Sequence, residues 1–429
     1  MSIMPFDRTE ESNIRIHVLP TDRFKTYAVS LYIGSPLTEQ DVTPNALTPF
    51  VLRRGTKRLP ETKQFREKLD ELYGAGFGFD IYKRGNNQIV QFRMDTIADR
   101  YTEGQSNKQL LQETLHFLIE AITKPYLENN AFAAKYVASE KNTVSKRLEA
   151  IINDKIRYAA ERCTQVMFAD DPFRYNALGR QDQLDAQTPE SLYAHYREWL
   201  RQAQIDLYVV GDTSLQVVQT IVKAAWAFDK QAATPYRFEL PALTRADVQT
   251  VTEQLDVSQG KLNMGLTLPI LYADSDYTAA LLYNGILGGY PHSKLFVNVR
   301  EKASLAYYAS SRYDGFKGML MLQSGIEIDQ YDKAVAIIKA QFDELTNGNI
   351  SELELSQTKA MMTNQLKEIS DSAFEMIAFD FNRVLTGSER TITGLIEDIQ
   401  TATRDQVVAV AGKVKLNTIY FLRDRKGGQ

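Results

Sequence analysis

The feature that most constrains the fold is an internal repeat of helix, strand and turn. Residues 188–212, TPESLYAHYREWLRQAQIDLYVVGD, have the pattern of a capped amphipathic helix that runs into an apolar strand and an acidic turn, and residues 403–424 repeat this order. Residues 68–94 and 299–325 form a second pair, in which a helix end is followed by strand, turn and strand. The two offsets are similar, so the sequence predicts two structurally similar halves.

The order of elements within each half predicts the fold class. Hairpin-type strands come early, long helices follow and a strand closes each half, which is typical of an α+β fold whose mostly antiparallel sheet carries helices on one face. The alanine-rich segment 131–163 can run as one helix. Two prolines and mixed polar residues at 228–246 interrupt the helical pattern. We therefore expect a first half at 1–230, a linker at 231–246 and a second half at 247–429.

Composition restricts the location and the partners of the chain. Its 54 acidic and 50 basic residues give a formal net charge of −4 and are interspersed, so no basic face for nucleic acid and no polybasic patch for a membrane is expected. No segment approaches the roughly 18 apolar residues of a spanning helix, and the start of the chain has no secretory pattern. The one cysteine, Cys163, excludes an intrachain disulfide. These features predict a cytoplasmic protein.

Side chains that usually bind metals or act as nucleophiles are sparse. The four histidines, His17, His116, His195 and His292, have no second histidine at helical spacing, whereas a catalytic zinc needs three protein ligands. Each is expected to be a surface residue or a hydrogen-bonded core residue. Cys163 has no histidine nearby in sequence, and Gly-x-Ser-x-Gly is absent, so Cys163 is expected to be structural.

One run, residues 286–318, places an arginine and a tyrosine around a helix end. Ser293 can cap a helix that gives way to a strand. Arg300 then ends the helix, while Tyr307 lies on the strand, on the same side as Ala309. Such a layout can direct a guanidinium and a phenol at one point in a cleft. The same residues also suit a structural role, because arginine at a helix C-terminus complements the helix dipole and tyrosine is common in strands.

Six short segments carry a family pattern. The most specific is SKLFVNVREKASLAY (293–307), which contains Leu-Phe, Arg-Glu-Lys and Leu-Ala-Tyr in order. The others are RRGTKRLP (53–60), LDELYG (69–74), SEKNTV (139–144), DDPFRYNALG (170–179) and VVGD (209–212). With these segments the chain resembles the insulinase or pitrilysin family of inverted-motif zinc peptidases, in particular its mitochondrial-processing-peptidase-like branch. The resemblance covers nearly the whole chain and implies two similar halves arranged as a clam shell.

The resemblance also indicates what the first half lacks. In the family a helix carries His-x-x-Glu-His, whose histidines bind zinc and whose glutamate activates water. In this chain Ala46, Pro49 and Phe50 occupy those three positions. The family's third ligand is a glutamate seven residues after Glu140, and Arg147 stands there, with no lone pair for zinc. The chain alone is therefore expected to be inactive, and Pro49 predicts that the ligand-presenting helix is disturbed.

The second half keeps the family's other contribution to catalysis. The resemblance implies that Arg300 and Tyr307 bind the substrate backbone and donate hydrogen bonds to the carbonyl oxygen on which charge develops. Some bacterial members of the family work in pairs, with zinc in one subunit and the arginine and tyrosine in the other. The leading hypothesis is therefore a zinc-less subunit of a heterodimeric zinc metallopeptidase for peptides or unfolded segments. An edge strand at 77–82 would bind substrate in extended form.

Two other hypotheses remain open. A non-catalytic scaffold or peptide-binding protein that forms a homodimer would need no arginine and tyrosine in a chamber. An independent enzyme would need a relocated site. Under the leading hypothesis the chain itself holds no cofactor, and any zinc is supplied by the partner subunit.

Overall fold

The computed structural model describes residues 5–102, 109–241 and 247–425. Its contacts divide the chain into two compact units. The first unit comprises Met1–Leu148, Tyr175–Arg237 and Ser372–Phe381, and the second comprises Glu149–Arg174, Phe238–Asp371 and Asn382–Gln429. Each unit therefore includes a short segment from the opposite half of the sequence. Residues 242–246 of the predicted linker lie outside the described residues.

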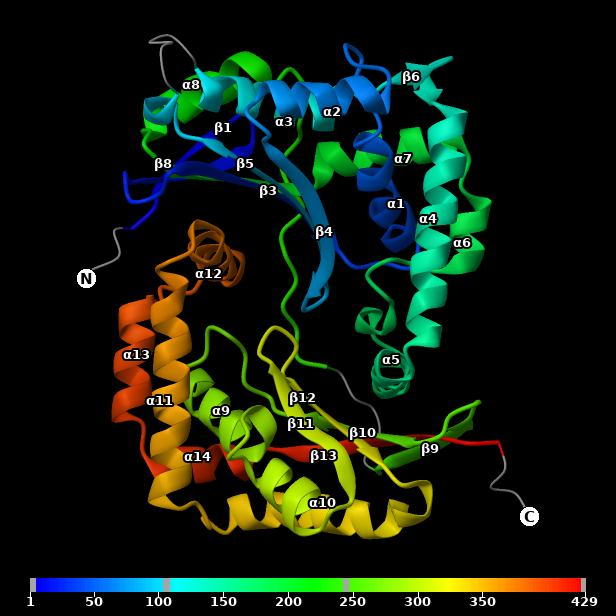
Figure 1. Cartoon of the computed structure of the whole chain (residues 1–429), viewed down its shortest axis with the longest axis vertical. Coiled ribbons are helices and arrows are strands. Elements are labelled where there is room, and N and C mark those ends of the chain that lie inside the picture. Colours follow the sequence, from blue (N-terminus) through cyan, green and yellow to red (C-terminus); the bar gives the residue numbers. More distant parts are fainter. Residues whose placement is uncertain (1–4, 103–108, 242–246, 426–429) are drawn as a thin grey trace. The chain divides into compact units, whose positions relative to one another are not determined.

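The first unit is built on a six-stranded sheet that is mostly antiparallel. In spatial order its strands are β1 (Asp7–Glu11), β2 (Ile14–Pro20), β8 (Gln204–Gly211), β3 (Thr26–Pro36), β5 (Asn87–Ile97) and β4 (Gly76–Arg84). Of these pairs, β2 and β8 run parallel. The first half of the chain also forms α1 (Val42–Leu52), α2 (Thr62–Glu71), α3 (Leu110–Thr123), α4 (Ala134–Asn153), α6 (Gln181–Ala186), α7 (Pro189–Gln202) and α8 (Leu215–Ala225). Figure 1 shows α3 and α8 along one side of the sheet.

The second unit repeats this strand order. Its five-stranded sheet has the order β11 (Ala306–Asp314), β12 (Met319–Ile326), β10 (Gly260–Thr267), β13 (Lys415–Arg423) and β9 (Gln249–Gln254). This order matches β4, β5, β3, β8 and β2 of the first sheet, and the last pair is parallel in both. The structure thus confirms the predicted repeat and the α+β class.

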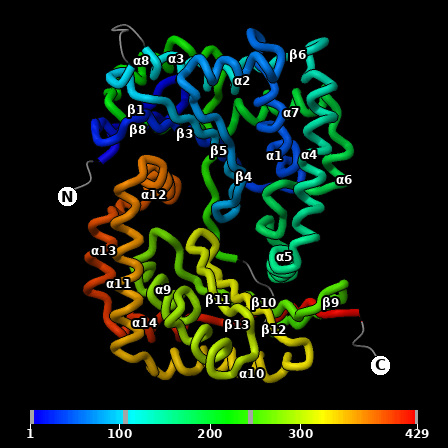
Figure 2. Tube along the Cα trace, in the orientation of Figure 1, coloured from blue at the N-terminus to red at the C-terminus, as the bar shows by residue number. Residues whose placement is uncertain are grey.

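Among its described residues, the second half of the chain forms six α-helices in addition to its sheet. They are α9 (Tyr277–Asn284), α10 (Tyr331–Thr346), α11 (Glu352–Ile369), α12 (Ala373–Thr386), α13 (Ile392–Thr401) and α14 (Arg404–Ala411). Figure 2 shows α11 and α13 side by side in the second unit. None of the helices in the described ranges combines the length and apolar composition that crossing a bilayer requires.

Strand alternation explains why each sheet needs a cover on both faces. In β3, Leu31 and Ile33 point to the helices and belong to the main hydrophobic core of the first unit, whereas Tyr32 points to the opposite face and is 1% exposed. A buried tyrosine on that opposite face means that another segment covers it.

The cover of the first sheet comes from α12. The ring of Phe381 stacks on Tyr32 with 3.7 Å between ring centroids. Next to it, the Asp380 carboxylate accepts two hydrogen bonds from the Arg8 guanidinium, both at 2.8 Å. Arg8 and Asp380 are 372 residues apart in sequence. A distant segment of the chain therefore completes the first unit.

The cover of the second sheet comes from α5 (Lys155–Met167). Cys163 and Met167 pack against β10 so closely that a Cβ at Gly265 would lie 2.6 Å from the Met167 sulfur. The prediction of one helix over 131–163 is wrong, because the helical pattern breaks at Asp154. The Asp154 carboxylate accepts the backbone N–H groups of residues 156 and 157 and starts α5 as a new helix.

His17 lies in the polar network beneath α12. It is 2% exposed, its Nε2–H donates to Asp206 at 2.9 Å, and its Nδ1 accepts from Arg8. A proton on Nδ1 would displace the Arg8 donor. Burial, the largest cause, and the positive charge of Arg8 lower the pKa of His17, although Asp206 opposes this.

Replacing Phe381 with alanine should lower the free energy of unfolding by about 3–5 kcal/mol, because the variant loses a buried aromatic ring and leaves a cavity against Tyr32. Both tryptophans, Trp199 and Trp226, belong to the first unit, so urea denaturation followed by tryptophan fluorescence reports this unit. Val217→Ala on α8 of the same unit is the control, since that side chain is 48% exposed and should change the free energy by less than about 0.5 kcal/mol. Equal effects would contradict the covering role of α12.

Stability should fall as the pH drops below about 6.5, the ordinary pKa of histidine. His17 takes up a proton in the unfolded chain but resists it in the fold, so the unfolded state binds more protons in that range. The urea midpoint of the wild type should be lower at pH 5.5 than at pH 7.5, and His17→Gln should reduce this difference. An unchanged difference in the variant would show that another group is responsible.

Candidate functional site

The helix that would carry the zinc ligands is intact. α1 continues from Val42 to Leu52 through Pro49, so the expected disturbance is wrong. The Arg53 N–H still donates to the Pro49 carbonyl at 3.3 Å. Ala46, Pro49 and Phe50 are all buried, so these positions have become part of the core rather than of an open site.

Arg147, at the position that the resemblance assigns to the third ligand, lies next to α1. The Arg147 guanidinium on α4 lies over the Phe50 ring, 4.8 Å from its centroid. The residues at two ligand positions therefore meet in space, but they present an aromatic ring and a cation. This contact is a cation–π interaction, which needs no metal.

Two further arginines, Arg53 and Arg54, lie near Arg147. We call these three residues the arginine cluster. Arg54 forms a hydrogen-bonded ion pair with Glu140, whose side chain is fully buried, and Arg53 pairs with the same carboxylate at 3.5 Å. Burial, the largest cause, lowers the pKa of Arg53, and the charges of Arg54 and Arg147 lower it further, against the pull of Glu140. The sequence analysis missed Arg53 and Arg54, although they follow Phe50 at the spacing that shares one helix face.

These residues do not fit zinc. Alanine, proline, phenylalanine and arginine have no lone pair to donate, and a divalent cation would meet like charge from the arginine cluster. Across the residues that the structure describes, no group of three or more His, Cys, Asp and Glu side chains could hold a metal ion.

Arg300 lies on an unusual helix. Residues Phe296–Lys302 form a π-helix, with Val299 fully buried and Arg300 exposed. The Arg300 guanidinium lies 4.6 Å from the centroid of the Phe296 ring. The expected cap is wrong, because the buried Ser293 hydroxyl makes no hydrogen bond within the described structure. The wider π turn, rather than a cap, sets the direction of Arg300.

Tyr307 lies at a β-bulge. Ala306 pairs with Ile326 and residue 308 pairs with Gly325, so Tyr307 is the extra residue of β11. Its side chain is 61% exposed while Ala309 is 5% exposed, so the prediction that these two share one side is wrong. A bulge re-aims a side chain, and bulges are over-represented beside active sites.

The Tyr307 hydroxyl donates to Glu327 at 2.5 Å. This hydrogen bond, and the negative charge of Glu327, raise the pKa of Tyr307 and keep its proton in place. Arg300 contacts Phe296 instead, so the two predicted site residues have different neighbours. Between them, Ser304 has a φ of 52°, which is left-handed for a residue other than glycine. Two exposed hydrogen-bond donors thus stand on either side of a strained turn.

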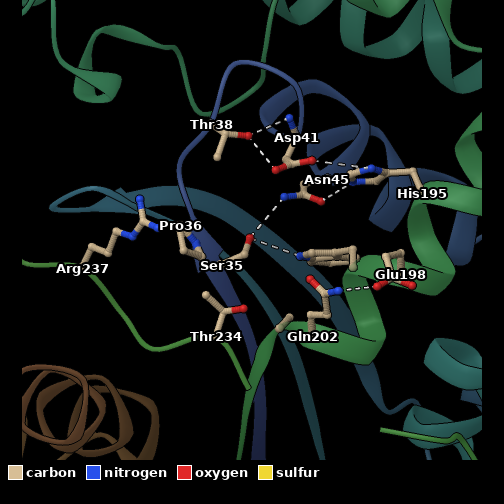
Figure 3. Close-up of a pocket in the computed structure, with 12 residues that line it drawn as sticks. Ser35, Pro36, Thr38, Asp41, Asn45, His195, Glu198, Gln202, Thr234 and Arg237 are labelled. Atoms are coloured by element: carbon tan, nitrogen blue, oxygen red, sulfur yellow. Dashed lines mark hydrogen bonds and ion pairs between the residues drawn. The ribbon is translucent and has the colours of Figure 1, made fainter. Parts of the chain in front are cut away.

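A polar cavity of about 240 Å³ lies in the first unit beside α1 and α7 (Figure 3). His195 Nε2 lies 2.8 Å from the Asn45 side-chain oxygen, and Asn45 uses its NH₂ group to donate to Ser35 and Gln88. His195 must therefore donate through Nε2, and its Nδ1 lies 3.8 Å from Asp41. Ala46 and Phe50 do not line this cavity, so it is not the former zinc position.

His17, His195 and His292 are hydrogen-bonded, as expected from sequence, and His116 is half-buried. His292 Nε2 lies 2.9 Å from the Thr358 hydroxyl. Burial raises the pKa of the Cys163 thiol to about 12, which makes the thiol unreactive at neutral pH.

Comparisons with known proteins agree with this geometry. The family described as the peptidase M16 inactive domain matches residues 187–362. YmfF of Bacillus subtilis (strain 168), described as a probable inactive metalloprotease, is 39% identical over 425 residues, which cover 98% of each chain.

Two solved structures have the same fold. A conserved protein from Enterococcus faecalis V583 aligns with a TM-score of 0.91 at 30% identity, covering 99% of this chain and 100% of that one. A peptidase M16 inactive domain from Pseudomonas fluorescens aligns with a TM-score of 0.81 at 18% identity, covering 99% and 100%.

The repeated α+β fold and the replaced zinc ligands define a class of inactive peptidase homologues. Within this class, the chain belongs to the M16 peptidase family, which is the insulinase or pitrilysin family.

Replacing Arg54 with leucine should lower the free energy of unfolding by about 3 kcal/mol, because the buried Glu140 carboxylate would keep only Arg53, at 3.5 Å. The double variant Arg54→Leu/Glu140→Leu removes the buried charge as well and should recover most of this loss. Urea denaturation followed by tryptophan fluorescence measures both. A double variant as unstable as the single one would show that lost packing, rather than an unpaired charge, is the cause.

Proposed function

We propose that this chain is the zinc-less subunit of a cytoplasmic, heterodimeric zinc metallopeptidase, and that Arg300 and Tyr307 act on substrate bound by a zinc-bearing homologue. The observation that carries the proposal is an asymmetry between the halves. Zinc positions are filled by core residues and Arg147, whereas Arg300 and Tyr307 stay exposed on an irregular backbone.

The backbone around these two residues supports a functional role. A π-helix, a left-handed Ser304 and a bulge at Tyr307 occur within twelve consecutive residues, 296–307. A left-handed residue other than glycine costs on the order of 1–3 kcal/mol, and π-helical turns and β-bulges are frequent at functional sites. A purely structural arginine and tyrosine would not need them.

The chemistry of the two side chains fits peptide hydrolysis. The Arg300 guanidinium is permanently charged and offers several N–H donors to carbonyl oxygens. The raised pKa of Tyr307 keeps the phenol protonated and therefore able to donate. In the productive complex Tyr307 would exchange its bond to Glu327 for one to the substrate oxygen on which charge develops.

Substrate would add as an extended strand to β4. This strand is at the edge of the first sheet, where it pairs with β5 alone. The unpaired backbone groups of an edge strand bind an extended peptide by main-chain hydrogen bonds. This placement supports peptides or unfolded segments as substrates.

Arg300→Ala and Tyr307→Phe should each lower the kcat of the reconstituted pair by about 10² to 10³, which is typical for the loss of one such donor. The chain is purified with a homologue that contains His-x-x-Glu-His, and cleavage of an internally quenched fluorescent peptide is measured. Tyrosine is changed to phenylalanine so that only the hydroxyl is lost.

Arg312→Ala is the matched control, because Arg312 is an exposed arginine on β11, the strand that also carries Tyr307. It should leave the rate unchanged. If all three variants cleave like the wild-type pair, the proposal is wrong and the non-catalytic scaffold becomes the better hypothesis.

A further inference from the structure

The former zinc position carries an excess of positive charge. Arg53 and Arg54 share the single carboxylate of Glu140, and the charges of Glu140, Arg54 and Arg147 all act on Arg53. The arginine cluster therefore retains two uncompensated positive charges, at the place where family members bind a divalent cation. Charge of one sign at close range is unfavourable unless an anion offsets it.

The excess charge is accessible to a ligand. Arg147 is exposed, and no carboxylate among the described residues pairs with it. The Arg53 side chain is 37% exposed. By contrast, the Arg54 guanidinium is used by Glu140 and Ser139. Arg53 and Arg147 are thus open to solvent at least in part, while Arg54 holds the buried carboxylate.

Aromatic rings fix the direction of these two groups. Phe50 supports both Arg53 and Arg147, with guanidinium-to-centroid distances of 5.5 and 4.8 Å. Arg53 also lies 5.6 Å from the ring of Phe79, which is on the edge strand β4. An arginine held over an aromatic face can still form hydrogen bonds in its own plane, and its restricted motion reduces the entropy lost on binding.

We propose that the arginine cluster is a carboxylate-binding site, in which Arg53 and Arg147 bind the C-terminal carboxylate of a peptide that lies along β4. Arginine's planar fork matches a carboxylate in two-point geometry. The neighbouring edge strand favours a peptide over a free small anion, because it adds main-chain hydrogen bonds beside the charge. This proposal rests on the peptide binding in the proposed function, but it needs no partner subunit and no catalysis.

The test uses the full chain alone and one peptide in two forms. The peptide Ser-Val-Thr-Leu-Ser-Thr-Leu, labelled with fluorescein at its N-terminus, is made with a free C-terminal carboxylate or a C-terminal amide. Fluorescence anisotropy should show that the acid form binds about tenfold more tightly than the amide, as expected for charge-assisted hydrogen bonds that are partly exposed. The difference should shrink at high salt.

The double variant Arg53→Gln/Arg147→Gln should abolish the preference for the acid form. Arg54 is kept, so that Glu140 stays paired and the fold is preserved, which circular dichroism checks. Arg66→Gln is the matched control, since Arg66 is an exposed arginine on α2 in the same unit, and it should keep the preference.

Equal affinity of the two forms for the wild-type chain, or no binding of either, overturns the proposal. A preference that survives in the double variant overturns it as well. Failure of the proposed function is a different result. It is seen when Arg300→Ala and Tyr307→Phe cleave the peptide like the wild-type pair. A chain can prefer the acid peptide while Arg300 and Tyr307 prove dispensable, or the reverse.

Discussion

Both faces of each sheet must be covered, and the second cover comes from the opposite half of the chain. Tyr32 needs a partner for its ring, and Phe381 of α12 supplies it. Gly265 leaves room on β10 for Met167 of α5. Because each unit is completed by a helix encoded in the other half, neither half of the sequence contains all of its own core. The linker is thus one of several connections between the units.

The former zinc position shows how a metal site is replaced within an unchanged fold. α1 keeps its helical course through Pro49, and the facing helix keeps Glu140 in the core. A buried carboxylate requires a positive partner, and Arg54 provides it. The Arg147 guanidinium lies over the Phe50 ring. A cation–π contact thus joins two residues whose positions would carry zinc ligands in the family.

Much of the organisation could be predicted from sequence, because it depends on periodicity and on short motifs. The repeat of helix, strand and turn and the missing ligands can be recognised in short segments of the sequence, whereas the order of the strands in each sheet was not predicted. The break at Asp154 could not be predicted with the same certainty, since alanine-rich segments on both sides favour helix and one capping carboxylate decides the outcome. The side of Tyr307 was mispredicted because a bulge depends on the register between β11 and the next strand, β12, which the alternation of residues within β11 does not show.

By itself, the sequence determined which chemical groups the protein has: no side chain able to bind zinc at Ala46, Phe50 and Arg147, and an arginine and a tyrosine at 300 and 307. Only the tertiary structure decided what these groups contact. It joined Arg53 and Arg54 to Glu140 and Tyr307 to Glu327. Arg54 and Glu140 are 86 residues apart, and Tyr307 and Glu327 are 20 residues apart around two strands in a register set by a bulge. No local pattern specifies such pairs, because they depend on how helices and strands meet in the folded chain.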